Sequence, residues 1–152
     1  FNPSVWLEDD GSFEGIKQQQ MLDNEAELLA QELKQAKEEA LASIRVTTQA
    51  GNTFDGNETA RNNLLSSIKA IADTTSLLQK LQPADAYSYI EANKLLDLFT
   101  IDESYAITHS MWKLTNNEVV LVPIKELDEA LALAIQECGR IVIANSIEKV
   151  GV

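Results

Sequence analysis

The sequence predicts an α+β fold with a long N-terminal helix and two short β-hairpins packed with three further helices. Residues 17–43 lack Gly and Pro and are dominated by Ala, Glu, Gln, Leu and Lys, which favour helices. Two other stretches, residues 44–55 and 104–122, alternate apolar and polar residues around turn signals, as half-buried hairpins do. Strands and helices do not alternate along the chain, so a parallel α/β fold is not expected.

The amino-acid composition limits the kinds of partner that this protein is expected to bind. The chain has 152 residues, the size of one domain, and 45% of them are hydrophobic, which is enough for a core. The 24 acidic residues outnumber the 12 basic ones. This net charge repels nucleic-acid phosphates and anionic membrane surfaces, so we expect neither nucleic acid nor membrane as a partner. A single cysteine rules out an intrachain disulfide.

Residues 1–16 are expected to form an extended interaction arm. Val5, Trp6 and Phe13 flank a turn signal at residues 9–12, and two exposed aromatic rings would call for a contact. The arm is expected to pack as a small hairpin or as a strand lent to a neighbour. It has no basic region or apolar core of a signal peptide. Since Phe1 is not Met, we expect a processed product or a segment of a longer polypeptide.

Helix 17–43 carries a heptad seam whose apolar residues step by four and three positions alternately. The seam consists of Leu22, Ala26, Leu29, Leu33, Ala36 and Ala40. Two interpretations remain open. The seam packs on another helix of the same chain, or it packs on copies of itself or on a partner. Residues 17–152 are expected to form a single domain, with this helix as its oligomerisation or docking helix and Leu22, Leu29 and Leu33 as contact residues.

The first hairpin is expected at residues 44–55, with a turn at residues 50–52. A helix from about residue 58 to 81 should follow, with Asn57 as its N-cap. Its expected apolar face is broad, and residues 73–76 form a weak patch where it is expected to bend or break. The face consists of Ala60, Leu64, Leu65, Ile68, Ile71, Ala72 and Leu78.

Pro83 is expected to begin a third helix that ends near Phe99. The second hairpin should run from residue 104 to 122, with its turn at residues 116–117. One face of its first strand should hold Ile107, and the other should hold Ser110, Trp112 and Leu114. Pro123 should end the ladder, because it has no N–H to donate. A last helix, residues 124–145, should place Leu127, Leu131, Ile135, Cys138 and Val142 on one stripe, with a strand at residues 139–144 as the alternative.

No arrangement of residues predicts catalysis. His109 is the only histidine and has no nearby cysteine, so a typical zinc site is not expected. Cys138 lies on an apolar stripe and is expected to behave as a small buried hydrophobe. A Cys138–His109 nucleophilic pair has no sequence signature. Acid pairs such as residues 128–129 are expected to be solvated. We expect no enzyme, no metal and no cofactor.

Two segments together resemble a domain of unknown function found in bacteriophage and prophage tail proteins. The first is Phe54-Asp55-Gly56 before a capped helix, which is similar to the F-x-G element of that family. The second is Trp112, the Asn116-Asn117 turn, a short apolar strand and an opening helix with Glu126-Leu127. The resemblance covers roughly residues 17–148. Thr115-Asn116 stands where the family usually has Asp-Asn, and Ile124-Lys125 replaces the usual Thr/Ser helix cap.

The resemblance implies a virion protein, made in the bacterial host cytoplasm, that acts as a structural or adaptor component of the tail tip, baseplate or tail fibre. Its partners would be other phage tail proteins, or further copies of itself in a trimer or hexamer. The alternative is a tail-fibre assembly chaperone that is not retained in the virion. The family implies no catalytic residue. Phe54, Gly56 and Trp112 are then expected to be structural anchors that hold the hairpins on the helices.

Overall fold

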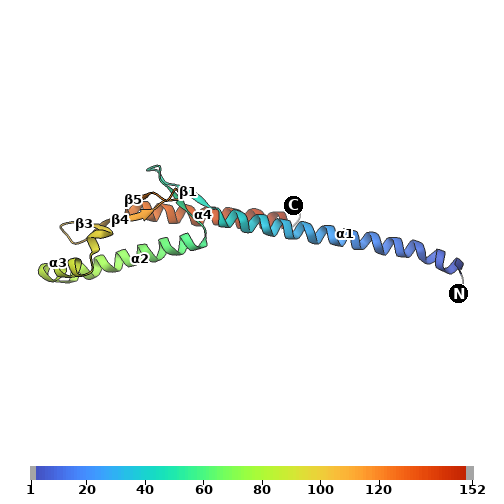
Figure 1. Ribbon diagram of the computed structural model, residues 1–152, viewed down its shortest axis with the longest axis horizontal. Helices are drawn as coiled ribbons and strands as arrows, with labels where there is room; N and C mark the ends of the chain where they lie inside the picture. Colours follow the sequence, from blue (N-terminus) through green and yellow to red (C-terminus); the bar gives the residue numbers. More distant parts are fainter. Residues whose placement is uncertain (1–2, 150–152) are drawn as a thin grey trace. The chain divides into compact units, whose positions relative to one another are not determined.

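The computed structural model describes residues 3–149, and in that range it shows an α+β fold (Figure 1). Four α-helices accompany a two-stranded and a three-stranded antiparallel sheet within this part of the chain. The predicted fold class is therefore confirmed. The chain divides into two compact units, residues 1–39 and residues 40–152.

The first unit consists of one helix, α1, Pro3–Ala42. The last turn of this helix, residues 40–42, belongs to the second unit. The prediction of an extended arm is wrong for residues 3–16, because these residues are helical. Proline is tolerated in the first turn, where its missing N–H has no helical partner. Each glycine costs the helix about 1 kcal/mol, but extending an existing helix avoids a new nucleation step. The division between units falls after residue 39 rather than after residue 16.

The first hairpin of the second unit confirms its prediction. Strands β1, Arg45–Thr47, and β2, Thr53–Asp55, pair antiparallel with Val46 opposite Phe54. The side chains of Ile44, Val46 and Thr48 are buried, as alternation requires. Gly51 has a φ of 92°, a backbone conformation that glycine adopts without strain, and it closes the turn.

Helix α2, Glu58–Lys80, begins where the sequence predicts. The side chain of Asn57 accepts a 2.9 Å hydrogen bond from the N–H of Ala60, so the N-cap is confirmed. The helix continues without a break through residues 73–76. Its buried residues are Leu64, Ile71 and Leu78, seven positions apart, whereas Leu65 is exposed. The buried face is therefore narrower than expected.

The prediction that the third helix reaches Phe99 is wrong. Helix α3 is Pro83–Ala92, a short 3-10 turn η1 covers Leu95–Asp97, and strand β3 is Phe99–Ile101. Lys94 adopts a left-handed conformation with a φ of 52°, which ends the helical path. The sequence does not predict strand β3, because three residues are too few to show an alternating pattern of apolar and polar residues.

The expected second hairpin is part of a three-stranded sheet in the order β3-β4-β5. Strands β4, Ile107–Lys113, and β5, Val119–Pro123, place Trp112 opposite Val120. The predicted faces hold from Ser110 to Leu114. Ile107 was expected on the other face, yet it is buried like Ser110. The register shift between Thr100 and Ile101 explains this, because an extra β4 residue reverses the phase of alternation.

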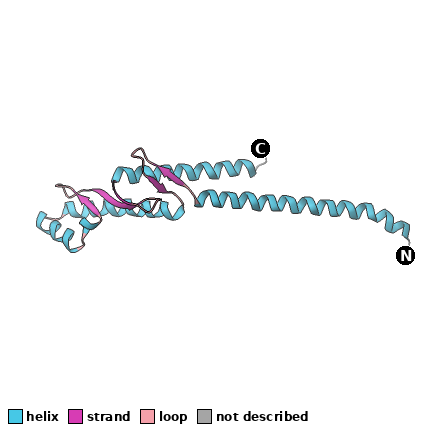
Figure 2. Ribbon diagram, turned by 45° about the horizontal axis from the view of Figure 1, so that its top comes forward, coloured by secondary structure: helices cyan, strands magenta, loops and turns pink. Residues whose placement is uncertain are grey.

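Helix α4, Ile124–Lys149, follows β5 without a loop and contacts α2 and both sheets (Figure 2). Its buried stripe consists of Leu127, Ala130 and Ala134, whereas Ile135 is 56% exposed. The predicted stripe through Ile135 and Val142 is therefore wrong. Ala130 and Ala134 belong to the main core cluster, and Ala134 packs closely against Gly56 at the end of the first hairpin.

The core lies in the second unit. Its largest fully buried side chains are Phe54, Leu64, Leu78, Leu127 and Val122. A smaller cluster of Leu78, Ala86 and Ile90 lies under α3. Leu41, at the end of α1, packs against the main cluster.

Candidate functional site

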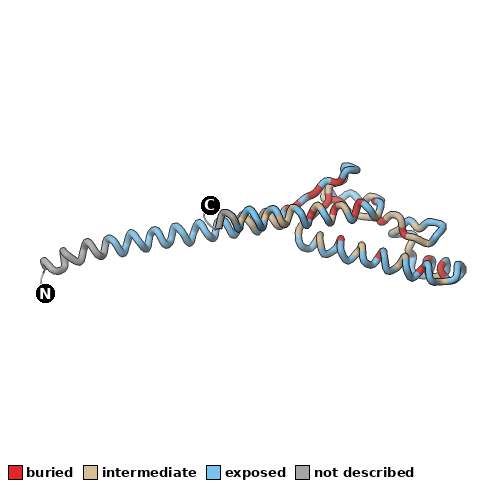
Figure 3. Tube along the Cα trace, turned by 180° about the vertical axis from the view of Figure 1, so that it is seen from behind, coloured by how far each residue is buried: buried red, intermediate tan, exposed pale blue. Residues whose placement is uncertain are grey.

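The candidate site is the apolar stripe of α1. Leu22 is 57% exposed, Leu29 is 56% exposed and Leu33 is 36% exposed. Every residue from 15 to 36 is exposed, as the pale blue trace of α1 shows (Figure 3). A single helix cannot bury a stripe on its own surface, so these leucines need a partner to leave water. We call Leu22, Ala26, Leu29, Leu33, Ala36 and Ala40 the α1 seam.

Two further exposed apolar side chains lie to one side of the seam leucines. Met21 and Leu28 each stand one position before a seam leucine, and both are 56% exposed. Isolated exposed hydrophobic residues are common on protein surfaces, but several on one helix face indicate an interaction site. This face is the strongest candidate for contact with another protein among the described residues.

Polar side chains on α1 support the helix itself. The Gln19 amide donates a 3.0 Å hydrogen bond to Asp23, and the Gln35 amide donates a 3.1 Å bond to Glu39. Both pairs are four residues apart, which places them one helical turn from each other. They stabilise the helix without occupying the seam.

The arm residues Val5, Trp6 and Phe13 lie on the helical backbone of α1 rather than on a strand. Their side chains lie outside the residues whose side chains the structure describes. Their role as contact residues therefore stays a prediction.

The residues named as anchors differ in burial. Phe54 is 1% exposed and lies in the core, and Trp112 is partly buried against it. Gly56 is buried for a reason that the sequence did not show. A Cβ at this position would lie 2.5 Å from Cγ2 of Ile44 and 3.1 Å from Cβ of Ala134. Gly56 thus permits close packing of three segments, rather than an unusual turn conformation.

A buried polar cluster joins the first hairpin to α4. Oε1 of Glu126 accepts 2.7 Å hydrogen bonds from the Thr48 hydroxyl and from the Asn52 amide. Glu126 is 6% exposed and lies in the first turn of α4, where the helix dipole favours a negative charge. Nearby, Glu129 accepts a 2.9 Å hydrogen bond from the backbone N–H of Gln49, so this acid is not simply solvated.

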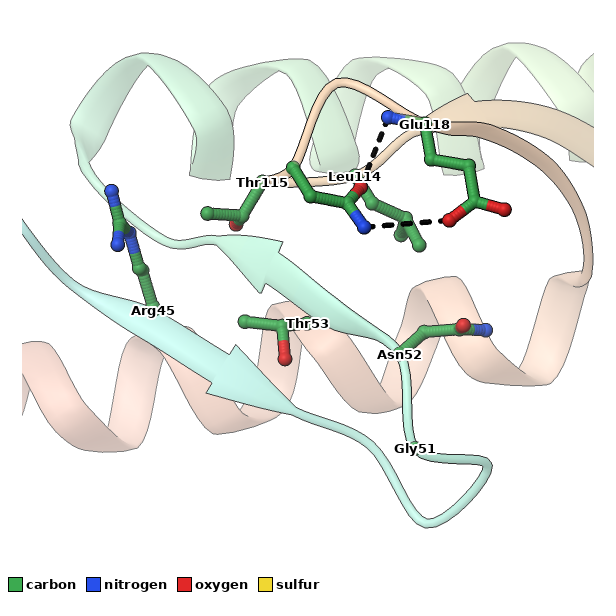
Figure 4. Close-up of a pocket in the computed structure, with 8 residues that line it drawn as sticks. Arg45, Gly51, Asn52, Thr53, Leu114, Thr115 and Glu118 are labelled. Carbon is green, nitrogen blue, oxygen red and sulfur yellow. Dashed lines mark hydrogen bonds between the residues drawn. The ribbon is translucent and has the colours of Figure 1, made fainter.

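A shallow pocket of about 510 Å³ lies between the β1–β2 hairpin and the β4–β5 turn (Figure 4). Thr115 joins its two walls, because its N–H donates to the Thr53 carbonyl at 3.1 Å and its hydroxyl donates to Asp55 at 2.9 Å. The Asn116 side chain accepts from the Glu118 N–H and donates to the Glu118 carboxylate. These polar groups are therefore hydrogen-bonded to one another, and the pocket lies where the two hairpins contact each other.

The two residues considered for nucleophilic chemistry lie in ordinary structural settings. His109 is on β4, and its Nδ1 is 2.9 Å from the Thr108 hydroxyl. Cys138 is partly buried on α4 and packs against the main core. Among the residues described, no group of three or more His, Cys, Asp or Glu side chains is arranged to hold a metal ion.

Within the described range, no helix is both long enough and apolar enough to cross a membrane. Comparisons with family models, with curated proteins and with solved structures find no match for this chain. The resemblance of residues 54–56 and 112–127 to phage tail domains therefore stays a prediction.

Proposed function

We propose that this protein is a structural or adaptor component that binds other protein chains through the α1 seam. The observation that carries the proposal is the exposure of Leu22 and Leu29 at heptad spacing, on the part of α1 that forms a compact unit separate from the rest of the chain. Heptad spacing brings apolar side chains of adjacent helices together along a continuous line. A surface of this kind is suited to another helix.

The expected strength of this contact is moderate. Fully burying one leucine side chain contributes about 1.5–3 kcal/mol. Three of the six seam residues are alanines, which bury little area but let two helices approach closely. A stripe of this composition favours association of several copies, or association supported by a second contact, over one very tight pair.

The motifs around Phe54 and Trp112 support a more specific form of the proposal. Their resemblance to phage tail domains supports a role in the virion, at the tail tip, the baseplate or the attachment of a fibre. Its partners there are other tail proteins or further copies of itself, in a trimer or hexamer. The role rests on protein contacts, with no residue assigned to catalysis.

The acidic charge of the first unit favours one alternative. Residues 1–39 hold ten of the 24 acidic residues and three of the 12 basic ones. An acidic, exposed helix suits a chaperone that shields basic or apolar surfaces of a fibre protein during assembly. Mass spectrometry of purified virions separates the two roles, because only a structural component is retained in the particle.

Light scattering coupled to size exclusion, at two protein concentrations, tests the seam. The native chain is expected to form a defined oligomer, and the double variant Leu22→Ser, Leu29→Ser is expected to be monomeric. Leu65→Ser is the matched control, because Leu65 is 59% exposed on α2 and lies outside the seam. The control variant should keep the native mass.

Two results would overturn the proposal in this form. One is a native chain that is monomeric at both concentrations, which would mean that the seam does not join copies. The other is an oligomer whose mass is unchanged by the double variant, since its interface would then lie elsewhere. Circular dichroism of each variant confirms that the helix content is retained.

A further inference from the structure

We infer that α1 associates in parallel with α1 of a second copy, so that Glu32 of each chain faces the partner's Lys37. This inference rests on the proposed function and adds the partner, the orientation and the register of the contact. The evidence for it is the pattern of charged residues on both edges of the seam, which plays no part in the proposed function.

The seam fixes the heptad positions. Ala26, Leu33 and Ala40 follow their preceding seam residue by four positions, which assigns them to position a. Leu22, Leu29 and Ala36 then occupy position d. The residues beside this line, at positions e and g, face the neighbouring helix at the edge of the contact, and their charges set its orientation.

Position g is acidic in three successive heptads, at Glu25, Glu32 and Glu39. Position e holds Asp23, Ala30 and Lys37. In a parallel pair, each g residue faces the e residue five positions later in the partner. Glu32 then meets the partner's Lys37, and Glu25 meets the partner's Ala30. No pair of like charges arises along the edge.

In an antiparallel pair, like charges meet along one edge of the seam. There, position g lies opposite position g of the partner, so the three glutamates face one another and repel. Position e lies opposite position e, so Asp23 meets the partner's Lys37 twice, but the three glutamate–glutamate contacts outnumber these two attractive contacts. The charges therefore favour the parallel pair, and the Glu32–Lys37 contact forms twice in a dimer by symmetry.

A second copy fits the seam better than an unrelated basic helix. Lys37 and Glu32 lie on opposite edges of the same seam, five residues apart, and this spacing matches the parallel contact between identical chains. A basic partner would be repelled by Lys37 while it was attracted by the glutamates. A requirement for such a partner would appear in the test as a monomeric native chain, which would overturn the inference.

Disulfide trapping tests the orientation in the full chain with Cys138→Ser as background. Ala26→Cys and Ala36→Cys each place one thiol on the seam without removing a leucine. In a parallel pair, equivalent residues come close enough to bond, so each variant should form covalent dimers by itself. In an antiparallel pair with full overlap, residue 26 lies opposite residue 36, so dimers would form only when the two variants are mixed. Gln31→Cys, at the outward position f, is the control and should stay monomeric under denaturing conditions.

Charge exchange tests the register. Glu32→Lys and Lys37→Glu should each weaken self-association about fivefold, since two charge pairs at the edge of the contact are lost in a dimer. A mixture of the two variants should restore association, because every Lys then faces a Glu of the other chain. Equal weakening in the mixture would overturn the Glu32–Lys37 register.

The outcomes separate this inference from the proposed function. If Leu22→Ser and Leu29→Ser abolish the oligomer but dimers form only between Ala26→Cys and Ala36→Cys chains, the seam binds as proposed and the parallel orientation is wrong. If the oligomer survives loss of both leucines, the proposed function fails irrespective of orientation. Self-dimers of both cysteine variants, together with restored association in the charge mixture, support the inference.

Discussion

The carboxylate of Glu126 accepts a 2.7 Å hydrogen bond from the hydroxyl of Thr48, 78 residues earlier in the chain. The same oxygen accepts a second bond of 2.7 Å from Asn52. A buried carboxylate without hydrogen bonds would be strongly unfavourable, so this cluster fixes how the first hairpin sits on α4. The side chain of Glu126 thus connects the start of α4 with the end of β1 and with the turn of the first hairpin.

Replacing Glu126 with Ala should lower the free energy of unfolding by about 2–3 kcal/mol, because the buried hydroxyl of Thr48 and the amide of Asn52 lose their acceptor. Urea unfolding measures the change. Asp128→Ala, at a neighbouring exposed position of α4, is the control and should change stability by less than about 0.5 kcal/mol. Similar losses in both variants would contradict a specific role for Glu126.

Replacing Gly56 with Ala should destabilise the protein by about 1–3 kcal/mol, because the new Cβ would overlap Cγ2 of Ile44. Gly139→Ala is the matched control. A Cβ at Gly139 meets nothing within 4 Å, so alanine there should raise stability by about 0.5–1 kcal/mol through its higher helix propensity. Thermal unfolding of the two variants should therefore shift in opposite directions, and shifts of the same sign would refute the steric account.

Replacing Phe54 with Ala should cost about 3–5 kcal/mol, since a fully buried aromatic ring leaves a cavity in the core. Trp112→Ala should cost less, because Trp112 is only partly buried. Chemical denaturation of both variants gives the comparison. A larger loss for Trp112 would mean that the sheet, rather than the first hairpin, dominates the core.

The turn after β3 should open in acid. Hydrogen bonds from the Ser104 hydroxyl, and then from the Ala106 N–H, hold the pKa of Asp102 below its usual range. A lowered pKa in the folded state means that this contribution to stability is present above about pH 4 and is lost as pH falls through the folded-state pKa. Amide exchange at Ser104 and Ala106, corrected for intrinsic rates, should rise below pH 4.

A variant makes the origin of this effect testable. Asp102→Ala should give fast exchange at Ser104 and Ala106 across the whole pH range, because the acceptor is absent. Asp73→Ala, at an exposed position of α2, should leave the exchange at both amides unchanged. Acid-induced opening that persists in Asp102→Ala would assign the titration to another group.

The sequence predicted the elements whose ends carry local signals. Asn57 marks the start of α2 because its side chain can bond the first turn, and Pro123 marks the end of the β5 ladder because it lacks an N–H. These are properties of one residue and its immediate neighbours. The turn at Gly51 was predicted for the same reason, since its left-handed backbone conformation favours glycine.

What the sequence did not predict depends on distant contacts. Ile135 is exposed while Ala134 is buried, because the neighbouring elements select the face of α4 by how closely they approach. The sequence does not predict the role of Glu126. Its hydrogen-bond partners lie far away in the chain, and acidic residues on a helix are usually exposed to solvent. Of the candidate site, the seam itself was predicted, but its exposure was not, because two interpretations of heptad spacing remained open.

The exposed helix α1 has a consequence for limited proteolysis. Trypsin cleaves after lysine, and residues 1–39 contain Lys17, Lys34 and Lys37. Cleavage requires local opening of the backbone, which occurs more readily in a helix with few tertiary contacts. Lys34 and Lys37 lie within the length of the seam, whereas Lys17 precedes it. A chain bound along the seam should therefore protect the second and third sites and leave the first open, which makes the digestion pattern a footprint of the bound partner.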